Sequence, residues 1–258
     1  MKPVTLVDLD DTLFRSRRKI VGYNDSQLTL GARVSDPDAA AAKYSYMDPI
    51  QKNMVNWLLE ASEVIPVTAR GTESYARVQI PFTSYAIVAN GAVILGPDGK
   101  PDAEWSERVT KDLLPLAGFF EELLEGGRTR AAAAGVSIRC WLVMEEGVAT
   151  YAVFKENEGD GARLAEIVPV VRQTGWVRHH NGNNLSLIPP MISKRLAAEF
   201  LLPRLRADEP YRPIVGYGDS ISDVSYLSLC DWWGAPRVSQ LTDLVANALA
   251  QTRTPQFE

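Results

Sequence analysis

Cysteine and histidine are the scarcest reactive residues of this 258-residue chain, which contains two of each. Cys140 and Cys230 are far apart, and neither has a cysteine or histidine near it at the spacing of a metal site. The sequence therefore indicates neither a disulfide framework nor a zinc site. A reducing, cytoplasmic location fits this cysteine usage best.

Excess basic charge and long apolar runs are also missing. Lysine and arginine number 27 against 32 aspartates and glutamates, so a net charge of -5 gives no basic surface for nucleic acid. No run approaches the roughly 18 apolar residues that a membrane-spanning helix needs, and no apolar segment follows a basic region at the N-terminus. We therefore expect no nucleic-acid partner, no membrane insertion and no export.

The composition that is present, 46% hydrophobic and 23% charged, is that of an ordinary globular protein. Short runs rich in Val, Ile and Leu predict buried strands over residues 4–9, 64–67, 85–89 and 213–217. Helical spacing predicts helices over 49–61 and 193–205. Strands that alternate with helices imply a parallel, doubly wound α/β sheet, whose ligand site lies at the carboxyl ends of the strands.

The predicted helix over 49–61 has a clear start, with Asp48 as N-cap and Pro49 in the first helical position. Its apolar face is expected to contain the five residues Ile50, Met54, Trp57, Leu58 and Ala61. Farther along the chain, Trp232 and Trp233 follow a short strand and are expected to pack at the edge of the core.

The middle of the chain has a different pattern. Strand–turn–strand segments with glycine at the turns alternate with helical stretches around 109–124 and 161–172. We therefore predict an inserted α+β domain over 93–184, and a core domain assembled from 1–92 and 185–258.

Three aspartates follow the first predicted strand within four positions. Asp8, Asp10 and Thr12 form the pattern D-x-D-x-T, and Asp11 is expected to be a turn residue. Clustered carboxylates repel one another unless a cation, a proton or hydrogen-bond donors compensate. Other polar residues stand at the ends of later strands or at the start of a helix: Thr68 in "VIPVTAR", Lys194 in "PPMISKRLAAEFL", and Asp219 and Asp223 in "PIVGYGDSISDVSYL".

These four motifs, spread through the whole chain, resemble those of the haloacid-dehalogenase superfamily of phosphohydrolases. The resemblance implies a Rossmann-like core with a central parallel sheet. The position and size of the insertion resemble the C2 type of cap domain, and its element order resembles the C2B subtype. Relatives with this cap are mostly small-molecule phosphatases, many of which act on sugar phosphates.

The resemblance also implies roles for the first motif and for a metal. Asp8 is the expected nucleophile, which forms an aspartyl-phosphate, and Asp10 the expected general acid and base. Mg²⁺ would be held by Asp8, Asp219 and the main-chain carbonyl of Asp10, while Asp223 would orient a metal-bound water or Lys194.

Thr68 and Lys194 are expected to bind the phosphoryl group. Arg70, in "TAR", either reaches the substrate or forms a surface salt bridge. Asn90 resembles part of an "NG" pair in related phosphatases, but a hairpin turn explains it as well. The long segment 15–46 either covers the site, with Arg15, Arg17 or Arg18 meeting a second anionic group, or is a solvated loop.

The sequence thus predicts a Mg²⁺-dependent phosphomonoester hydrolase for a small polar metabolite phosphate. Dehalogenation is disfavoured, because that chemistry needs neither the leaving-group acid Asp10 nor the metal ligand Asp219. A phosphomutase and a non-catalytic module that binds phosphorylated ligands are the alternatives, although a mere binder has no need of a proton shuttle such as Asp10. The oligomeric state stays open.

Overall fold

The computed structural model describes residues 1–33 and 44–252, and the chain divides into two compact units. The core unit comprises Met1–Pro101 with Lys194–Glu258, and the inserted unit comprises Asp102–Ser193. The insertion thus begins at 102 and ends at 193, whereas the sequence pattern suggested 93 and 184. The difference arises because the hairpin that follows residue 85 belongs to the core, and the strand that begins at Asn184 belongs to the inserted sheet.

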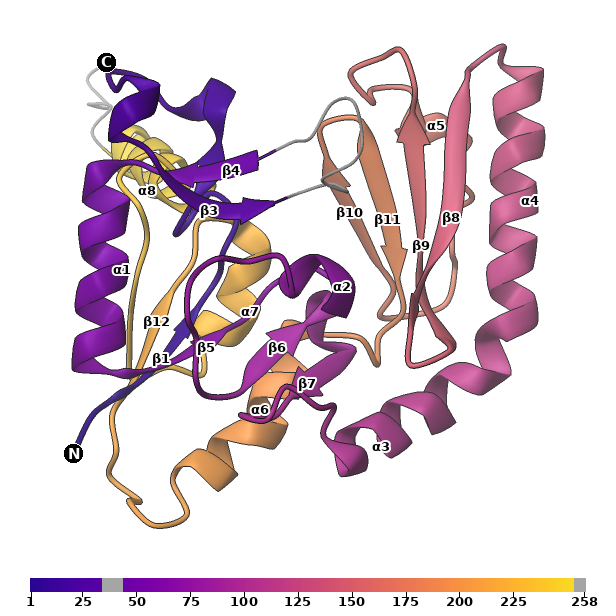
Figure 1. The fold of residues 1–258 in the computed structure, drawn as a ribbon. Coiled ribbons are helices and arrows are strands. Elements are labelled where there is room, and N and C mark those ends of the chain that lie inside the picture. Colours follow the sequence, from indigo (N-terminus) through magenta and orange to yellow (C-terminus); the bar gives the residue numbers. More distant parts are fainter. Residues whose placement is uncertain (34–43, 253–258) are drawn as a thin grey trace. The chain divides into compact units, whose positions relative to one another are not determined.

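A parallel four-stranded sheet forms the centre of the core unit (Figure 1). In spatial order its strands are β13 (Trp232–Gly234), β12 (Ile214–Tyr217), β1 (Val4–Val7) and β5 (Glu63–Pro66). Val4 is in register with both Ile214 and Glu63, so β1 has a parallel partner on each side. All four residues of β1 are buried. The α/β fold with a central parallel sheet, predicted from the alternation of strands and helices, is therefore confirmed.

Both edges of this sheet differ from the prediction. Trp232 and Trp233 lie on the outer strand β13 and are 66% and 49% exposed, so the expectation that they pack in the core edge was wrong. At the other end, β6 (Ala86–Val88) meets the residues after β5 in a parallel bridge between Val67 and Ile87, and the Thr68 amide donates to the Ile87 carbonyl at 2.9 Å. β6 forms an antiparallel hairpin with β7 (Val93–Leu95).

Helix α1 (Pro49–Ala61) has the predicted bounds and the predicted start. The Asp48 carboxylate accepts a hydrogen bond from the Gln51 amide nitrogen at 2.8 Å, which caps the first turn. The predicted buried face is right for Leu58 and Met54, which pack in or against the core, and wrong for Ile50 and Trp57, which are 70% and 53% exposed. The helix buries Gln51, Val55 and Leu58, and the inward-pointing Gln51 side-chain amide donates to the Thr12 carbonyl at 3.3 Å.

The remaining helices of the core unit are α2 (Thr72–Tyr75), α6 (Lys194–Leu205), α7 (Val224–Leu227) and α8 (Gln240–Thr252). Short 3-10 turns occur at Arg17–Lys19, Asp25–Gln27, Ala89–Gly91 and Ile221–Asp223. Helix α1 packs against β5, while α6 and α7 pack on each other and on β6 and β12. Figure 1 shows α1 on one side of the parallel sheet and α6 and α7 on the other.

The segment after the first motif forms a small antiparallel sheet, with the strand order β2 (Arg15–Ser16), β4 (Tyr44–Met47), β3 (Thr29–Arg33). Within it Arg17 pairs with Asp25, and both side chains are largely exposed. Residues 34–43 of the predicted covering segment lie outside the described part of the chain.

The inserted unit is an antiparallel sheet with helices packed on it. Its strands, in spatial order, are β10 (Val177–Asn181), β11 (Asn184–Ile188), β9 (Val148–Glu156) and β8 (Ile138–Glu145). Its helices are α3 (Ala103–Leu113), the short turn Leu114–Leu116, α4 (Ala117–Ala133) and α5 (Leu164–Ile167). Helix α4 packs on β8 and β9, and Gly127 of α4 allows the buried ring of Phe154 to approach its backbone.

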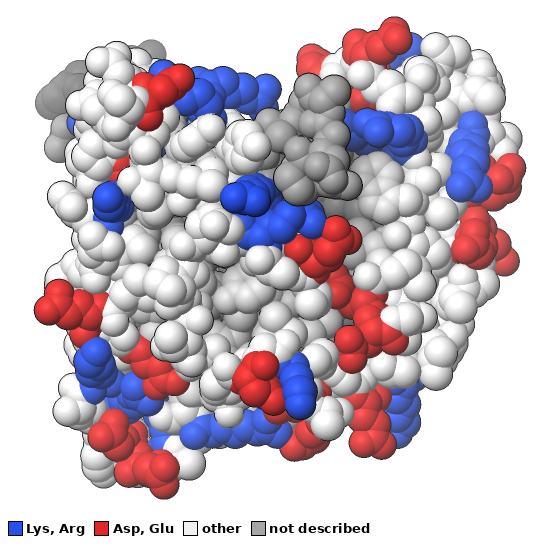
Figure 2. Space-filling model, in the orientation of Figure 1, with Lys and Arg blue, Asp and Glu red and all other residues white. Residues whose placement is uncertain are grey.

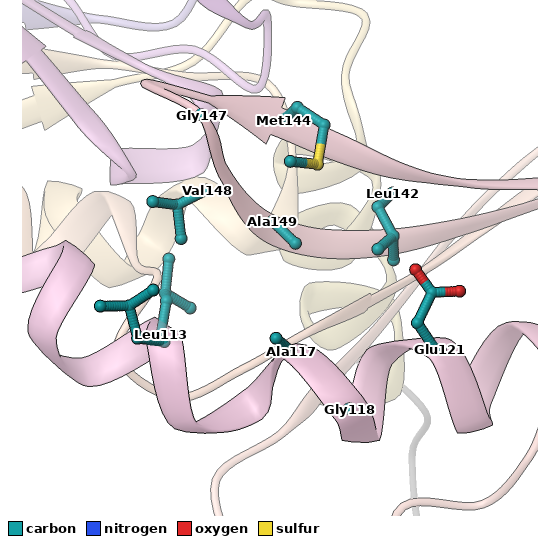
Figure 3. Close-up of a pocket in the computed structure, with 10 residues that line it drawn as sticks. Leu113, Ala117, Gly118, Glu121, Leu142, Met144, Gly147, Val148 and Ala149 are labelled. Carbon is teal, nitrogen blue, oxygen red and sulfur yellow. The ribbon is translucent and has the colours of Figure 1, made fainter.

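A pocket of about 440 Å³ lies in the inserted unit, between the α3–α4 corner and the β8–β9 hairpin (Figure 3). Its walls are apolar apart from the carboxylate of Glu121, and small residues such as Ala117 and Gly118 leave the space open. The described side chains that line it include no cation and no hydroxyl. It therefore lacks the groups that bind a phosphoryl anion.

Acidic and basic residues are interspersed on the face drawn in Figure 2, with no extended basic area among the described residues. Within 1–33 and 44–252, no helix combines the length and the apolar character that crossing a membrane requires.

The contact between α4 and β9 gives a prediction about stability. A Cβ added at Gly127 would lie 2.3 Å from a ring carbon of Phe154, which is fully buried. Overpacking of this kind costs about 1–3 kcal/mol, more than the ~1 kcal/mol that alanine gains over glycine in a helix. Gly127→Ala should therefore lower the midpoint of thermal unfolding, measured by circular dichroism.

Gly118→Ala is the matched control in the same helix, since a Cβ there would have no atom within 4 Å. It should leave the midpoint unchanged or raise it. A Gly127→Ala protein that melts at or above the wild-type midpoint would contradict the packing described for α4.

Candidate active site

Asp8 stands at the carboxyl end of the central strand β1, where the ends of β12 and β5 meet it. Its amide nitrogen donates to the Tyr217 carbonyl at 2.9 Å, which continues the β1–β12 ladder by one residue. Only 6% of Asp8 is exposed. A buried carboxylate requires partners, because desolvation penalises its charge.

Lys194, the first residue of α6, is the main partner of Asp8. Its ammonium donates to Oδ1 of Asp8 at 2.8 Å and to Oδ1 of Asp223 at 2.7 Å. The ammonium also lies 5.7 Å from the centre of the buried Tyr226 ring. One buried cation thus joins two carboxylates that are 215 residues apart in the sequence, since the two pairs span 186 and 29 positions and lie on either side of Lys194.

Asp223 is fully buried in the turn that follows β12. Its second oxygen, Oδ2, accepts hydrogen bonds from the amide and the hydroxyl of Ser220 at 3.0 and 2.8 Å. A Cβ at position 218 would lie 2.7 Å from Cβ of Asp223, so Gly218 allows this close approach. Both oxygens of Asp223 are therefore engaged in holding Lys194 and the turn.

A group of three carboxylates could hold a metal ion here. Asp8, Asp219 and Asp223 each offer an oxygen, and these atoms lie within 4.8 Å of one another. Oxygen ligands of this kind suit a hard divalent cation such as Mg²⁺. Both oxygens of Asp223 and both of Asp8 already accept hydrogen bonds, and Asp219 is the least buried of the three, so an ion here would share the Asp8 oxygens with Lys194 and Thr12.

Thr12 lies between these two carboxylates. Its hydroxyl is 3.3 Å from Oδ2 of Asp8 and 3.4 Å from Oδ1 of Asp219, and the residue is 8% exposed. The sequence motif D-x-D-x-T contained this threonine, but no role was derived for it. The spacing of four residues between Asp8 and Thr12 was the feature of the sequence that could have indicated their contact.

Burial raises the pKa of the Asp8 carboxyl to about 8; the Lys194 ammonium opposes the rise, and the carboxylates of Asp223 and Asp10 add to it. The pKa of Asp219 is raised to about 6 by burial and by the nearby charges of Asp223 and Asp11. Burial alone would lower the pKa of Lys194, but Asp8 and Asp223 raise it above its ordinary value. Three carboxylates thus lie near one ammonium, which donates hydrogen bonds to two of them, and a further cation or a proton would relieve their repulsion.

Thr68 follows β5 on the other side of β1. The Val67 amide donates to the Val7 carbonyl at 2.8 Å, which brings Thr68 to the same edge of the sheet as Asp8. Thr68 is 1% exposed, and its hydroxyl oxygen accepts a hydrogen bond from the Arg70 amide at 3.1 Å. The hydroxyl oxygen uses a lone pair for this bond, so the O–H group can still rotate to donate its proton to an anion.

Arg70 and Asp10 form an ion pair, with two hydrogen bonds between guanidinium and carboxylate. Of the two roles considered from the sequence, the structure shows the salt bridge, with the Arg70 side chain 8% exposed and that of Asp10 50% exposed. Asn90 lies in the β6–β7 turn with φ 58°, and its amide donates to the Thr68 carbonyl at 3.0 Å. Asn90 thus supports Thr68 through its backbone, and substrate contacts by Arg70 and Asn90 stay predictions.

Asp11 lies in the turn after β1 with φ 66°, and its carboxylate pairs with Lys19. Its side chain is therefore held by the turn, as expected for a residue outside the group of three carboxylates.

Comparison with known proteins identifies the fold. No protein-family model and no curated protein sequence matches the chain. A solved structure from Thermoplasma acidophilum is similar, with 13% identity, a TM-score of 0.58, and coverage of 95% of this chain and 89% of the other. A structure from Eubacterium rectale gives 11% identity, a TM-score of 0.51, and coverage of 95% and 91%.

A third similar structure is a phosphatase of the haloalkanoate enzyme superfamily from Bacteroides thetaiotaomicron, with 12% identity, a TM-score of 0.47, and coverage of 97% and 95%. The first two likenesses cover 95% of this chain and show that it shares its fold with solved structures, with a parallel-sheet core and an inserted α+β unit. Membership of the haloacid-dehalogenase superfamily stays a prediction from the motifs. The C2B subtype stays a prediction.

The crowding of carboxylates gives a prediction about pH and stability. Because the pKa of Asp219 is raised in the folded state to about 6, from an ordinary value of 3.8, the folded protein binds more protons than the unfolded chain between these values. Ionised Asp219 therefore costs stability, and this cost grows as pH rises from 4 to 6. In metal-free protein, Asp219→Asn should raise the thermal midpoint at pH 8 and have little effect at pH 4.

Mg²⁺ should raise the midpoint of the wild-type protein at pH 8 and have a much smaller effect on Asp219→Asn, because a bound ligand stabilises the state that binds it. Differential scanning calorimetry with and without chelator measures both effects. Equal Mg²⁺ shifts in the two proteins would refute a metal site at Asp219.

Proposed function

We propose that this chain is a Mg²⁺-dependent phosphomonoester hydrolase that acts on a small polar metabolite phosphate, such as a sugar phosphate, through an aspartyl-phosphate on Asp8. The observation that carries the proposal is the Asp8 carboxylate at the end of the central strand, held by Lys194 and grouped with Asp219 and Asp223. A nucleophile, a buried cation and an oxygen-rich metal site are the parts that phosphoryl transfer needs. Two free thiols, Cys140 and Cys230, support a reducing cytoplasm as its location.

In the first half-reaction, an oxygen of Asp8 attacks phosphorus and the bond from phosphorus to the ester oxygen breaks. Asp10 gives its proton to the leaving alcohol. The Lys194 ammonium and the Thr68 hydroxyl stabilise negative charge on the phosphoryl oxygens. Mg²⁺ bound by the carboxylates would act as a Lewis acid on the phosphoryl group.

In the second half-reaction, water attacks phosphorus of the aspartyl-phosphate and gives a proton to Asp10. The bond from phosphorus to Asp8 breaks, which releases inorganic phosphate and restores the Asp8 carboxylate. Splitting the displacement in this way replaces one difficult step by two easier ones.

Release of inorganic phosphate distinguishes this function from its alternatives. With Mg²⁺, the protein should release one phosphate for each ester consumed, when tested on an aryl phosphate and on a panel of metabolite phosphates. A phosphomutase would instead convert one phosphate ester into its isomer, and a binding module would bind esters without turnover. Binding without phosphate release across the panel would end the hydrolase proposal.

Replacement of the nucleophile should abolish turnover while the fold is kept. Asp8→Asn should lower kcat at least about 10³-fold, because an amide cannot form the phosphoenzyme. Asp11→Asn is the matched control, since it removes the same charge from the same loop at a residue held in the turn by Lys19. It should keep kcat within a few-fold of wild type, and substantial activity in Asp8→Asn would disprove the nucleophile assignment.

A further inference from the structure

Arg70 and Asp10 form an ion pair beside the site through two hydrogen bonds. Nε of Arg70 donates to Oδ2 of Asp10 at 2.7 Å, and a terminal nitrogen of Arg70 donates to Oδ1 at 2.8 Å. Two parallel bonds from a planar guanidinium fix the plane of a carboxylate as well as its position. A single lysine ammonium could not do this.

Arg70 is the fixed partner in this pair. Its side chain is 8% exposed, whereas that of Asp10 is 50% exposed. The guanidinium carbon lies 4.9 Å from the centre of the Phe14 ring, and Phe14 is fully buried. Arg70 is therefore held by packing and by a cation–π contact, and the more exposed carboxylate takes its orientation from it.

The backbone of Arg70 is anchored in the same turn that presents Thr68. Its amide donates to the Thr68 hydroxyl oxygen at 3.1 Å, and its carbonyl accepts from the Ala89 amide at 2.6 Å. Arg70 thus links the loop after β1 to the loop after β5 across 60 residues of sequence. In the described part of the chain, the Asp10 carboxylate receives side-chain hydrogen bonds from Arg70 alone.

We propose that Arg70 is a positioning residue, which holds the Asp10 carboxylate in the orientation needed for proton transfer. This inference rests on the proposed function, in which Asp10 is the acid and base. A carboxyl group has about four lone-pair sites, and Arg70 occupies two of them; the proton that Asp10 gives to the leaving oxygen, and takes back from water, is held on one of the other two. Without Arg70 the half-exposed side chain would rotate among solvated rotamers, and a misplacement of about 1 Å can cost roughly 100-fold in rate.

Direct contact of Arg70 with the substrate phosphoryl group is the competing role. The geometry disfavours it, because Nε and one terminal nitrogen already serve Asp10, and the side chain is almost fully buried. The two roles predict different kinetics. A positioning residue matters most when the leaving group needs a proton, whereas a phosphoryl contact matters equally for all esters.

The test compares kcat/KM for two esters, because this ratio reports the steps up to cleavage of the ester bond. An alkyl phosphate has a poor leaving group that needs an acid, and a dinitrophenyl phosphate has a good one that does not. Arg70→Ala should lower kcat/KM about 10–100-fold for the alkyl ester and less than about threefold for the dinitrophenyl ester. Equal losses for the two esters would overturn the positioning role.

A double-mutant cycle with Asp10 gives an independent readout. If Arg70 acts through Asp10, then Arg70→Ala should cause no further loss in an Asp10→Asn background. Losses that multiply would show that Arg70 acts on its own and would overturn the inference. Arg128→Ala, which removes an arginine from an exposed pair with Glu125, is the control and should leave both ratios unchanged.

Arg70→Lys keeps the charge without the two-pronged geometry, so it should show the same selective loss for the alkyl ester, and it carries the test if Arg70→Ala does not fold. The outcomes for the two proposals are distinct. If wild type releases phosphate and Asp8→Asn does not, but the Arg70 and Asp10 losses multiply, only the positioning role fails. A wild-type protein that hydrolyses neither ester overturns the proposed function and this inference together.

Discussion

A buried ammonium shared between two carboxylates is the interaction on which the rest of the site depends. Lys194 joins Asp8, at the end of the central strand, to Asp223, in the turn after β12. Each of these charges would be costly to bury alone, by several kcal/mol, so the loss of one leaves the others without compensation. The contact therefore fixes β1, α6 and the turn after β12 in one arrangement.

Even with this interaction, the site holds more negative than positive charge. With Asp219 included, three carboxylates face one ammonium, and burial raises the pKa values of Asp8 and Asp219. Clusters with such shifts are typical of functional sites, where stability is given up for chemistry. Arg70 and Asp10 are arranged differently, since they form a closed pair at the rim, with one side chain buried and the other half exposed. The three carboxylates can thus accept a cation, whereas the charges of Arg70 and Asp10 balance each other.

Local features of the chain were predictable because they depend on neighbours in the sequence. The bounds of α1 and its Asp48 cap followed from residue type and spacing, and so did the strands that lead to Asp8 and Thr68. Contacts with distant segments were not predictable in this way. The buried face of α1 was predicted only in part: Leu58 lies in the core, but Gln51 also points inward, where its side-chain amide donates to the Thr12 carbonyl.

The sequence by itself determined which residues end the strands, and hence the motifs, the fold class and the candidate site. The tertiary structure alone decided how those residues pair: that Thr12 lies between Asp8 and Asp219, and that Arg70 turns inward onto Asp10. The reason is physical. Periodicity and capping report on residues within one or two turns of each other, whereas the orientation of a side chain toward a partner 60 or 207 positions away is set by how whole elements pack.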